Sequence, residues 1–305
     1  VEHLTFNQVV GGSNPPCFTP KRPEESGLFF VVWETSFLYG KKRSTGTHKR
    51  RSGRKSLLRS AADRACVRAQ VFSSRMETSI WEEIIMLRNI DLDEISDGKL
   101  YTAGDLAKVG CQDCEGCCDC CCQMGDTIIL DPLDVWQLMQ GRGKSFEQLL
   151  DESVDLHVQD GVILPNLKMA GEKEQCVYLN EKGRCSIHPF RPGICRLFPL
   201  GRFYENGSFR YFLQTKECSR ENRTKQKIRK WIDMPEFSRY ETFVADWHFF
   251  VRRLQDRLMQ QSDMEAAQRI NRYILQEFYF RGWDAEQNFY DQFSERLKKA
   301  QKELA

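Results

Sequence analysis

The chain has 305 residues, of which 41% are hydrophobic, so its length allows one large domain or two ordinary ones with a sizeable core. Seven of its 13 cysteines lie between Cys111 and Cys122, and neighbouring cysteines rarely meet the geometry of a disulfide, which argues against a secreted disulfide scaffold. The apolar residues 28–38 are interrupted by Glu34 and precede a basic run, so we expect no secretory leader, and no segment has the roughly 20 apolar residues of a membrane span. These features favour a cytoplasmic protein without a membrane partner.

The net charge of +2 is divided unevenly along the chain. Residues 1–75 hold 14 Lys and Arg against 5 Asp and Glu, a balance of +9, whereas residues 76–305 have a balance of −7. The basic character typical of nucleic-acid binding is therefore confined to the first quarter. For the remainder we expect no nucleic-acid partner.

The first 75 residues contain no methionine, and the first one in the chain is Met76. Residues 11–16 back-translate to GGT GGT TCG AAT CCA CCA, which resembles the T-arm of a transfer RNA gene, and residues 5–7 resemble a lysine anticodon loop (ACT TTT AAT). We interpret residues 1–75 as an untranslated or disordered extension before a start at Met76. A basic nucleic-acid arm or a transit peptide is the alternative interpretation.

The first predicted elements follow in chain order from residue 76. Apolar spacing predicts a short amphipathic helix over residues 78–87. Beyond the cysteine run, residues 126–130 predict a strand. Asp131 and Pro132 then form the N-cap and first position of a helix that we expect to end at Gly141.

The middle of the chain has a second short helix and signals for three antiparallel hairpins. Ser145 and Gln148 have the spacing of a capping box. The expected strand pairs are 154–158 with 162–164 around Gln159-Asp160-Gly161, 176–179 with 184–187 around residues 180–183, and 202–204 with 209–212 around a turn that contains Asn206-Gly207.

From about residue 221 the pattern becomes helical. The expected buried stripes are Phe243, Trp247, Phe250, Leu254 and Leu258; Ile270, Ile274 and Phe278, closed by Gly282; and Phe289, Phe293 and Leu297 on a helix capped by Asp284. The predicted fold class is α+β, a small cysteine-rich metal-binding domain with antiparallel hairpins followed by a C-terminal helical bundle. Its expected parts are a helical lead-in (76–110), a cysteine-cluster domain (111–220) and a helical region (221–305).

The first cysteine cluster reads C-Q-D-C-E-G-C-C-D-C-C-C from Cys111 to Cys122. A C-x-x-C pair allows two sulfurs to reach one metal from a single turn, as in zinc and iron–sulfur sites. The longer pattern C-x-x-C-x-x-C-C fits in two registers, one formed by Cys111, Cys114, Cys117 and Cys118 and the other by Cys114, Cys117, Cys120 and Cys121. We favour the second register, because its Cys-Cys pair lies five residues before the predicted strand.

The second cluster contains Cys176, Cys185 and Cys195. The turn at residues 180–183 is expected to bring the first two together, and nearby prolines stiffen the segment that presents the third. Arg191 and Arg196 are expected to offset thiolate charge through hydrogen bonds.

These residues resemble the YkgJ-type cysteine-cluster family of zinc- or iron-chelating domains, marked by C-x-x-C-x-x-C-C and a later C…C-S-I-[HY]-x-x-R-P-x-x-C-R-x-F-P. The chain matches the later part in full from Cys176 to Pro199, and the resemblance covers residues 111–218. It implies metal or iron–sulfur binding in a bacterial cytoplasmic protein. The additional cysteines Cys118, Cys120 and Cys122 depart from the family pattern.

Ten cysteines are candidate metal ligands: Cys111, Cys114, Cys117, Cys118, Cys120, Cys121, Cys176, Cys185, Cys195 and Cys218. Cys218 is interpreted equally well as a ligand or as a thiol without a metal, and Cys122 as a buried packing residue. His188 is expected to stack or to donate a hydrogen bond, because the family equivalent can be aromatic.

Two classes of function follow from this pattern. One is an iron–sulfur or zinc protein with a redox or protein-modifying role, and the other is a zinc-stabilised structural or interaction module with a protein partner. An iron–sulfur cluster is expected ahead of zinc, because one tetrahedral zinc ion needs only four ligands and because sulfurs on adjacent residues start out pointing apart. No sequence motif identifies a substrate.

Overall fold

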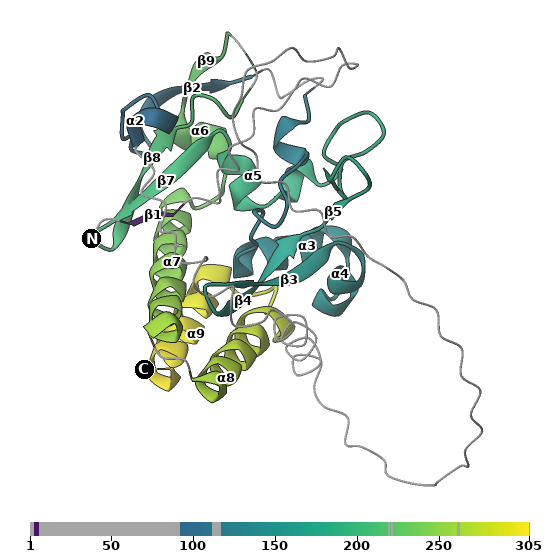
Figure 1. Cartoon of the computed structure of the whole chain (residues 1–305), viewed down its shortest axis with the longest axis vertical. Coiled ribbons are helices and arrows are strands. Elements are labelled where there is room, and N and C mark those ends of the chain that lie inside the picture. Colours follow the sequence, from purple (N-terminus) through teal and green to yellow (C-terminus); the bar gives the residue numbers. More distant parts are fainter. Residues whose placement is uncertain are drawn as a thin grey trace, which may run out of the picture. The chain divides into compact units, whose positions relative to one another are not determined.

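The computed structural model describes residues 3–5, 92–111, 117–218, 220, 222–260 and 263–304 (Figure 1). These residues form an α+β fold in which every strand pair is antiparallel, as predicted. The strands are β1 (His3–Thr5), β2 (Leu106–Gly110), β3 (Val154–Gln159), β4 (Val162–Leu167), β5 (Met169–Ala170), β6 (Gln175–Cys176), β7 (Leu200–Glu205), β8 (Ser208–Leu213) and β9 (Thr224–Lys227).

The helices are α2 (Leu92–Ile95), η3 (Asp119–Cys121), α3 (Pro132–Arg142), α4 (Phe146–Glu152), η4 (His188–Phe190), α5 (Gly193–Leu197), α6 (Ile228–Ile232), α7 (Phe237–Gln260), α8 (Met264–Ile274), η5 (Leu275–Phe280) and α9 (Phe289–Glu303). The expected helix over residues 78–87 lies outside the described residues. In the described part of the chain, none of the helices combines the length and apolar character needed to cross a membrane.

Two of the three expected hairpins form with the predicted turns. Strands β3 and β4 pair from Val154↔Leu167 to Gln159↔Val162, and both turn residues have positive φ, +48° at Asp160 and +84° at Gly161. Strands β7 and β8 are joined in the same way at Asn206 and Gly207, with φ values of +52° and +77°. A two-residue turn of this kind needs positive φ at both positions, which Asp, Asn and Gly tolerate best.

The expected hairpin around residues 180–183 forms its turn without its strands. Asn180 accepts a hydrogen bond from the Gly183 amide at 2.9 Å and donates one to the Arg184 carbonyl at 2.9 Å, but the flanking segments share only one bridge, Leu179↔Cys185. Cys176 instead belongs to β6, which pairs with β5 across a turn that the sequence did not indicate. The region around Cys176 and Cys185 is therefore held by short pairings.

The predicted strand at residues 126–130 was wrong, because this segment makes only one bridge, Ile129↔Asn166, beside β4. A turn closed by the Thr127 amide on the Met124 carbonyl at 3.0 Å occupies its beginning. The helix that starts at Pro132 limits the segment at its other end, and proline has no amide to extend a ladder. Only a short extended stretch remains.

The two predicted helix starts after this segment are confirmed. Asp131 caps α3 in a capping box with Asp134, and Ser145 caps α4 in a capping box with Gln148. The end of α3 was misplaced, since the helix continues through Gly141 and is closed by Gly143 in the left-handed region. A Cβ at Gly141 would lie 2.5 Å from the Phe190 ring, so packing explains this glycine.

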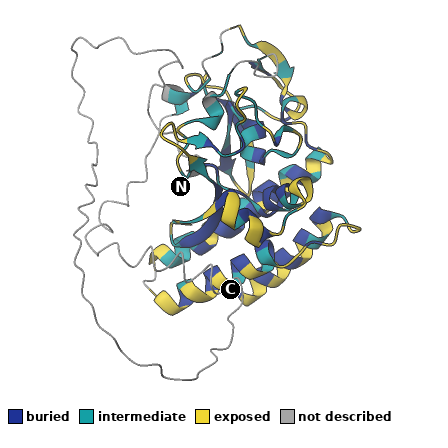
Figure 2. Cartoon of the chain, turned by 90° about the vertical axis from the view of Figure 1, so that its right-hand side faces the viewer, coloured by how far each residue is buried: buried dark blue, intermediate teal, exposed yellow. Residues whose placement is uncertain are grey.

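The C-terminal helices bury the predicted aromatic stripes except at Leu258, which is partly buried, and Figure 2 shows their buried and exposed faces. Phe243 and Phe293 have ring centroids 4.6 Å apart, and those of Trp247 and Phe278 are 5.0 Å apart. The cap of α9 was misassigned, because Asn288 and not Asp284 accepts the hydrogen bond from the helix start, the Tyr290 amide at 2.9 Å. Ring packing of this kind holds the three helices together.

One hydrophobic core extends from these helices to the hairpins and the cysteine region. The buried Asn271 of α8 accepts from the Ile163 amide at 2.7 Å and donates to the Gly161 carbonyl at 3.0 Å, so it satisfies polar groups at the start of β4. Tyr279 of η5 donates to the Leu130 carbonyl at 3.0 Å. These bonds connect the helical region to the segment just before α3.

Candidate metal centre

A cavity of about 50 Å³ lies among the two cysteine clusters. The cysteines in its wall are Cys117, Cys120, Cys121, Cys176, Cys185 and Cys195. Pockets for organic ligands measure roughly 300–1,000 Å³, so this cavity suits a metal ion or a small inorganic group better than an organic substrate.

Four separate segments bring these thiols together. Cys120 and Cys121 belong to the single turn η3, with Cys117 just before it. Cys176 ends β6, Cys185 follows the turn at residues 180–183, and Cys195 lies in α5. The fold thus joins cysteines up to 78 positions apart in one wall, the outcome that the two sequence clusters suggested.

The sulfurs of Cys120 and Cys121 are 4.0 Å apart, and both residues line the cavity. Two ligands on one tetrahedral zinc ion lie about 3.8 Å apart when each Zn–S bond is about 2.3 Å. These adjacent cysteines can therefore serve the same metal atom. The expectation that their sulfurs point apart does not hold here, because η3 is a tight turn and not an extended strand.

The pKa values of several of these thiols are raised in part by neighbouring cysteines, because the charge on one thiolate disfavours ionisation of the next. The thiols therefore behave as one electrostatic group. Burial raises the pKa of Cys176 to about 11, and burial followed by the charges of Cys120 and Cys176 raises the pKa of Cys195 well above its usual value. The pKa of Cys121 is also raised, first by its hydrogen bond with Cys120 and then by burial. Protein groups alone thus keep these thiols neutral, and a metal cation is the kind of group that would favour their thiolate forms.

Positive side chains line the same cavity next to Cys185. Burial raises the pKa of Cys185, and the guanidinium groups of Arg191 and Arg184 oppose that rise. The charge of Arg191 acts on Cys185 as expected, whereas its hydrogen bonds to a thiolate stay a prediction, and Arg196 has a different role. Its guanidinium donates to the carbonyls of Pro189 at 2.5 Å and Arg191 at 3.1 Å, which holds the loop before α5.

The donor chemistry fits a thiophilic metal, although the thiols are not yet arranged around one point. Among the residues that the structure describes, no three His, Cys, Asp or Glu side chains form a group ready to hold a metal ion. The thiols of Cys121, Cys176, Cys185 and Cys195 form no disulfides. Metal binding at this cavity therefore requires side-chain rotation but no bond cleavage at these four positions.

The remaining candidate cysteines are placed differently. Cys118 and Cys122 do not line the cavity, and the Cys122 thiol donates to the Cys118 sulfur at 3.5 Å. Gln175 Nε2 donates to the Cys122 sulfur at 3.8 Å. Cys111 and Cys218 also lie outside the cavity wall, and Cys114 lies outside the described residues.

Sequence reasoning missed the apolar residues that complete the cavity wall, among them Ile128, Met169 and Leu179. Their apolar character was visible in the sequence, but nothing in their spacing indicated a common cavity with the cysteines. His188 lines the cavity beside them, consistent with a position near the thiols.

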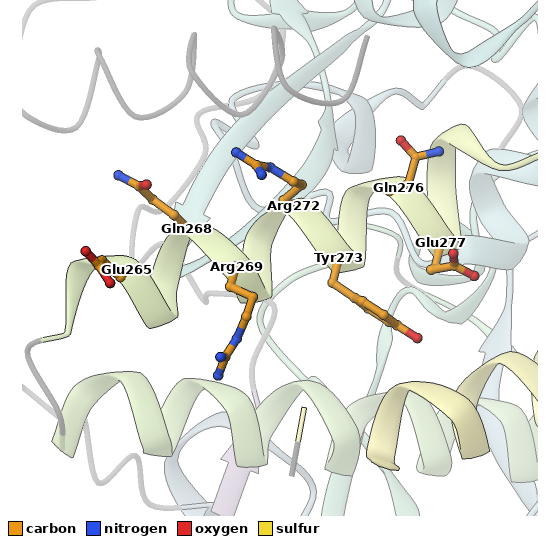
Figure 3. A pocket seen from close by; sticks show the side chains of 7 residues that line it. All are labelled: Glu265, Gln268, Arg269, Arg272, Tyr273, Gln276 and Glu277. Carbon is orange, nitrogen blue, oxygen red and sulfur yellow. The ribbon is translucent and has the colours of Figure 1, made fainter. Parts of the chain in front are cut away.

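A larger hollow of about 380 Å³ lies on the helical region (Figure 3). The described residues that line it are Glu265, Gln268, Arg269, Arg272, Tyr273, Gln276 and Glu277. They all come from one face of α8 and η5, and Figure 3 shows them spreading in different directions along this helix. They offer no convergent donor set, so the cysteine cavity is the candidate site.

Comparison with known families agrees with this choice. Residues 111–231 match the family model CxxCxxCC. This family is described as "Putative zinc- or iron-chelating domain", and the match covers about two fifths of the chain, including all six cysteines of the cavity wall. No match to the chain was found among curated proteins or among solved structures.

Proposed function

We propose that this protein chelates iron or zinc through cysteine thiolates at the six-thiol cavity. The convergence of thiols from four segments on a space of about 50 Å³ supports this function. The family match over residues 111–231 supports the same chemistry. A bound cation would supply the positive charge that the buried thiolates lack, and thiols in this state call for the reducing conditions of a cytoplasm.

The number of thiols favours more than one metal atom. One tetrahedral ion takes four ligands, whereas six cysteines among the described residues line this cavity. An iron–sulfur cluster, or two zinc ions that share bridging thiolates, would use such a set. We place the iron–sulfur cluster first on the thiol count alone, since the 4.0 Å approach of Cys120 and Cys121 suits either metal.

A structural role for the metal is supported by the form of the cysteine region. The segments that carry the six thiols contain only η3, η4, α5 and strands of two residues, so a metal would connect parts with few backbone hydrogen bonds of their own. In small sites of this kind, metal-binding free energy is folding free energy. A redox or protein-modifying role is the second candidate, and it requires a centre that accepts an electron reversibly.

The decisive experiment compares two cysteines that lie two positions apart. The full chain is produced with ample iron and zinc, purified without oxygen, and analysed for metal, acid-labile sulfide and visible absorption. We expect stoichiometric metal in the wild type, loss of most of it in Cys120→Ser, and retention in the matched control Cys122→Ser, because only Cys120 lines the cavity. A wild type without metal, or equal losses in both variants, would overturn the proposal.

The same preparations distinguish the two roles. A centre that is reduced and reoxidised at a defined midpoint potential supports the redox role. A colourless zinc protein without labile sulfide, which loses its fold on chelation, supports the structural role.

A further inference from the structure

A buried carboxylate lies at the beginning of the helix that carries Cys195. Asp134 of α3 is 5% exposed, and its Oδ1 accepts a hydrogen bond from the Gly193 amide at 2.7 Å. Its Oδ2 accepts from the Asp131 amide at 3.1 Å in the capping box of α3. One carboxylate therefore fixes the starts of α3 and α5 together, although they are about 60 residues apart in the chain.

Gly193 is also closely approached by the helical region. A Cβ at this position would lie 2.5 Å from Tyr240 Oη of α7, closer than real Cβ contacts, and 3.6 Å from Asp134 Oδ1. Arg202 of β7 donates to the same Tyr240 oxygen at 2.8 Å. The first residue of α5 is thus held between a carboxylate and a phenol, each fixed by its own hydrogen bond.

Asp134 does not line the cavity, so it is not a candidate ligand. The capping box requires only one of its oxygens, and the bond from the other to Gly193 contributes nothing to α3. Partners just outside the ligand shell commonly orient ligands and tune the metal. The carboxylate is also near enough for its charge to act on the Cys195 thiol.

We propose that Asp134 is a positioning residue of the metal centre, which holds the start of α5 and so directs the Cys195 thiol toward the metal. This inference rests on the proposed metal binding. The sequence indicated residues 131–134 (DPLD) only as a helix start, and this inference gives them a second role at the site.

The test uses the other carboxylate of the same capping box as its control. Asp134→Asn and Asp131→Asn both alter the start of α3, but only Asp134 also binds α5. Each full-length variant is loaded anaerobically, and metal affinity is measured by chelator competition together with the absorption or electron paramagnetic resonance spectrum. We expect about 10-fold weaker affinity and an altered spectrum in Asp134→Asn, at the lower end of the effect of such partners, with little change in Asp131→Asn.

Equal effects of the two variants on affinity and spectrum, with metal bound in the wild type, would overturn the positioning role and leave the proposed function intact. A wild type that binds no metal would overturn both. If Asp134→Asn fails to fold, Gly193→Ala displaces α5 without changing α3, and adding Tyr240→Phe removes the oxygen against which the new methyl group would press. Lower affinity in Gly193→Ala that returns in the double variant supports the proposal, and unchanged affinity in Gly193→Ala refutes it.

Discussion

The cysteine region and the C-terminal helices are stabilised in contrasting ways. The helices are long and share closely packed rings such as Trp247, Phe278 and Phe293, whose burial provides stability without any added group. The cysteine region, meaning the segments 117–121 and 175–199 that carry the six thiols, has only short elements. It places the thiols in the wall of one cavity, where burial and mutual charge raise their pKa values. The contrast is the one expected if the helices are stable as a polypeptide alone and the cysteine region depends on the proposed metal.

Removal of the metal should have the largest effect and should separate the two regions. Structural zinc contributes about 10–16 kcal/mol in small zinc-finger peptides, so its loss should open a region that has few hydrogen bonds of its own. We expect the amides of Ser186 and Arg196, which bond to the carbonyls of Tyr178 and Pro192, to exchange about 100-fold faster after chelation. Those in the middle of α7 should change by less than about 3-fold. Hydrogen exchange followed by mass spectrometry measures the exchange rates in both regions. Equal acceleration in the two regions would show that they are not stabilised in different ways.

A substitution in the ring-packed core should destabilise the C-terminal helices and leave metal binding unchanged. Phe278 is fully buried against Trp247 and Phe250, and Phe278→Ala should lower the free energy of unfolding by about 3–5 kcal/mol because it leaves a cavity. Chemical denaturation measures the loss, with Gln276→Ala on the outer face of the same segment as the control. Metal content per folded molecule should stay at the wild-type value, and a proportional loss of metal would show that the regions are one unit.

The sequence predicted most where local chemistry decides the structure. Asp160-Gly161 and Asn206-Gly207 specify their turns through positive φ, and Asp131 specifies a helix start through its side-chain oxygen. The pairing of β2 with β9 was missed, because it joins residues more than 110 positions apart and β9 is a polar segment without apolar alternation. Such a pairing has no local signal.

The same distinction between local and long-range signals applies to the candidate site. The spacing of the cysteines indicated a metal-binding chemistry, and both registers of the pattern contain Cys117, but the spacing alone could not tell whether Cys118 lines the cavity as well. That depends on the direction of each side chain as the chain enters η3, and Cys117 lines the wall while Cys118 meets Cys122. The bond from Gly193 to Asp134 was also invisible, since it depends on the packing of α5 against α3.

Asp134 connects α3 to the start of α5 in the cysteine region, and its titration offers a smaller test of that connection. Burial raises the pKa of Asp134 to about 6, against the opposing hydrogen bonds from Gly193 and Asp131. A carboxyl with a raised pKa stabilises the fold when protonated, so its contribution is fully present below about pH 4 and is lost as the pH rises through 6. We expect the stability difference between metal-free wild type and Asp134→Asn to change by up to about 2 kcal/mol between pH 4 and pH 7. Denaturation at each pH measures it, with Asp151→Asn as an exposed control; a constant difference would contradict the expectation.

Removal of residues 1–75 should have the smallest effect of all. In the described part of this segment, His3–Thr5 add the strand β1 to the free edge of β7, pairing Leu4 with Phe203. Three residues at an edge form few hydrogen bonds, each worth about 1 kcal/mol at most in net stability. The segment contributes none of the six cysteines of the cavity wall. A chain that starts at Met76 should therefore keep its metal and lose only about 1 kcal/mol of unfolding free energy, roughly the net worth of one such bond. Metal analysis and denaturation of the two chains measure this, with Leu4→Pro in the full chain as the control that interrupts β1 alone. Loss of metal from the shorter chain would show that the cysteine region depends on more than its thiols. Aggregation of the shorter chain that Leu4→Pro reproduces would show that the edge of β7 needs β1.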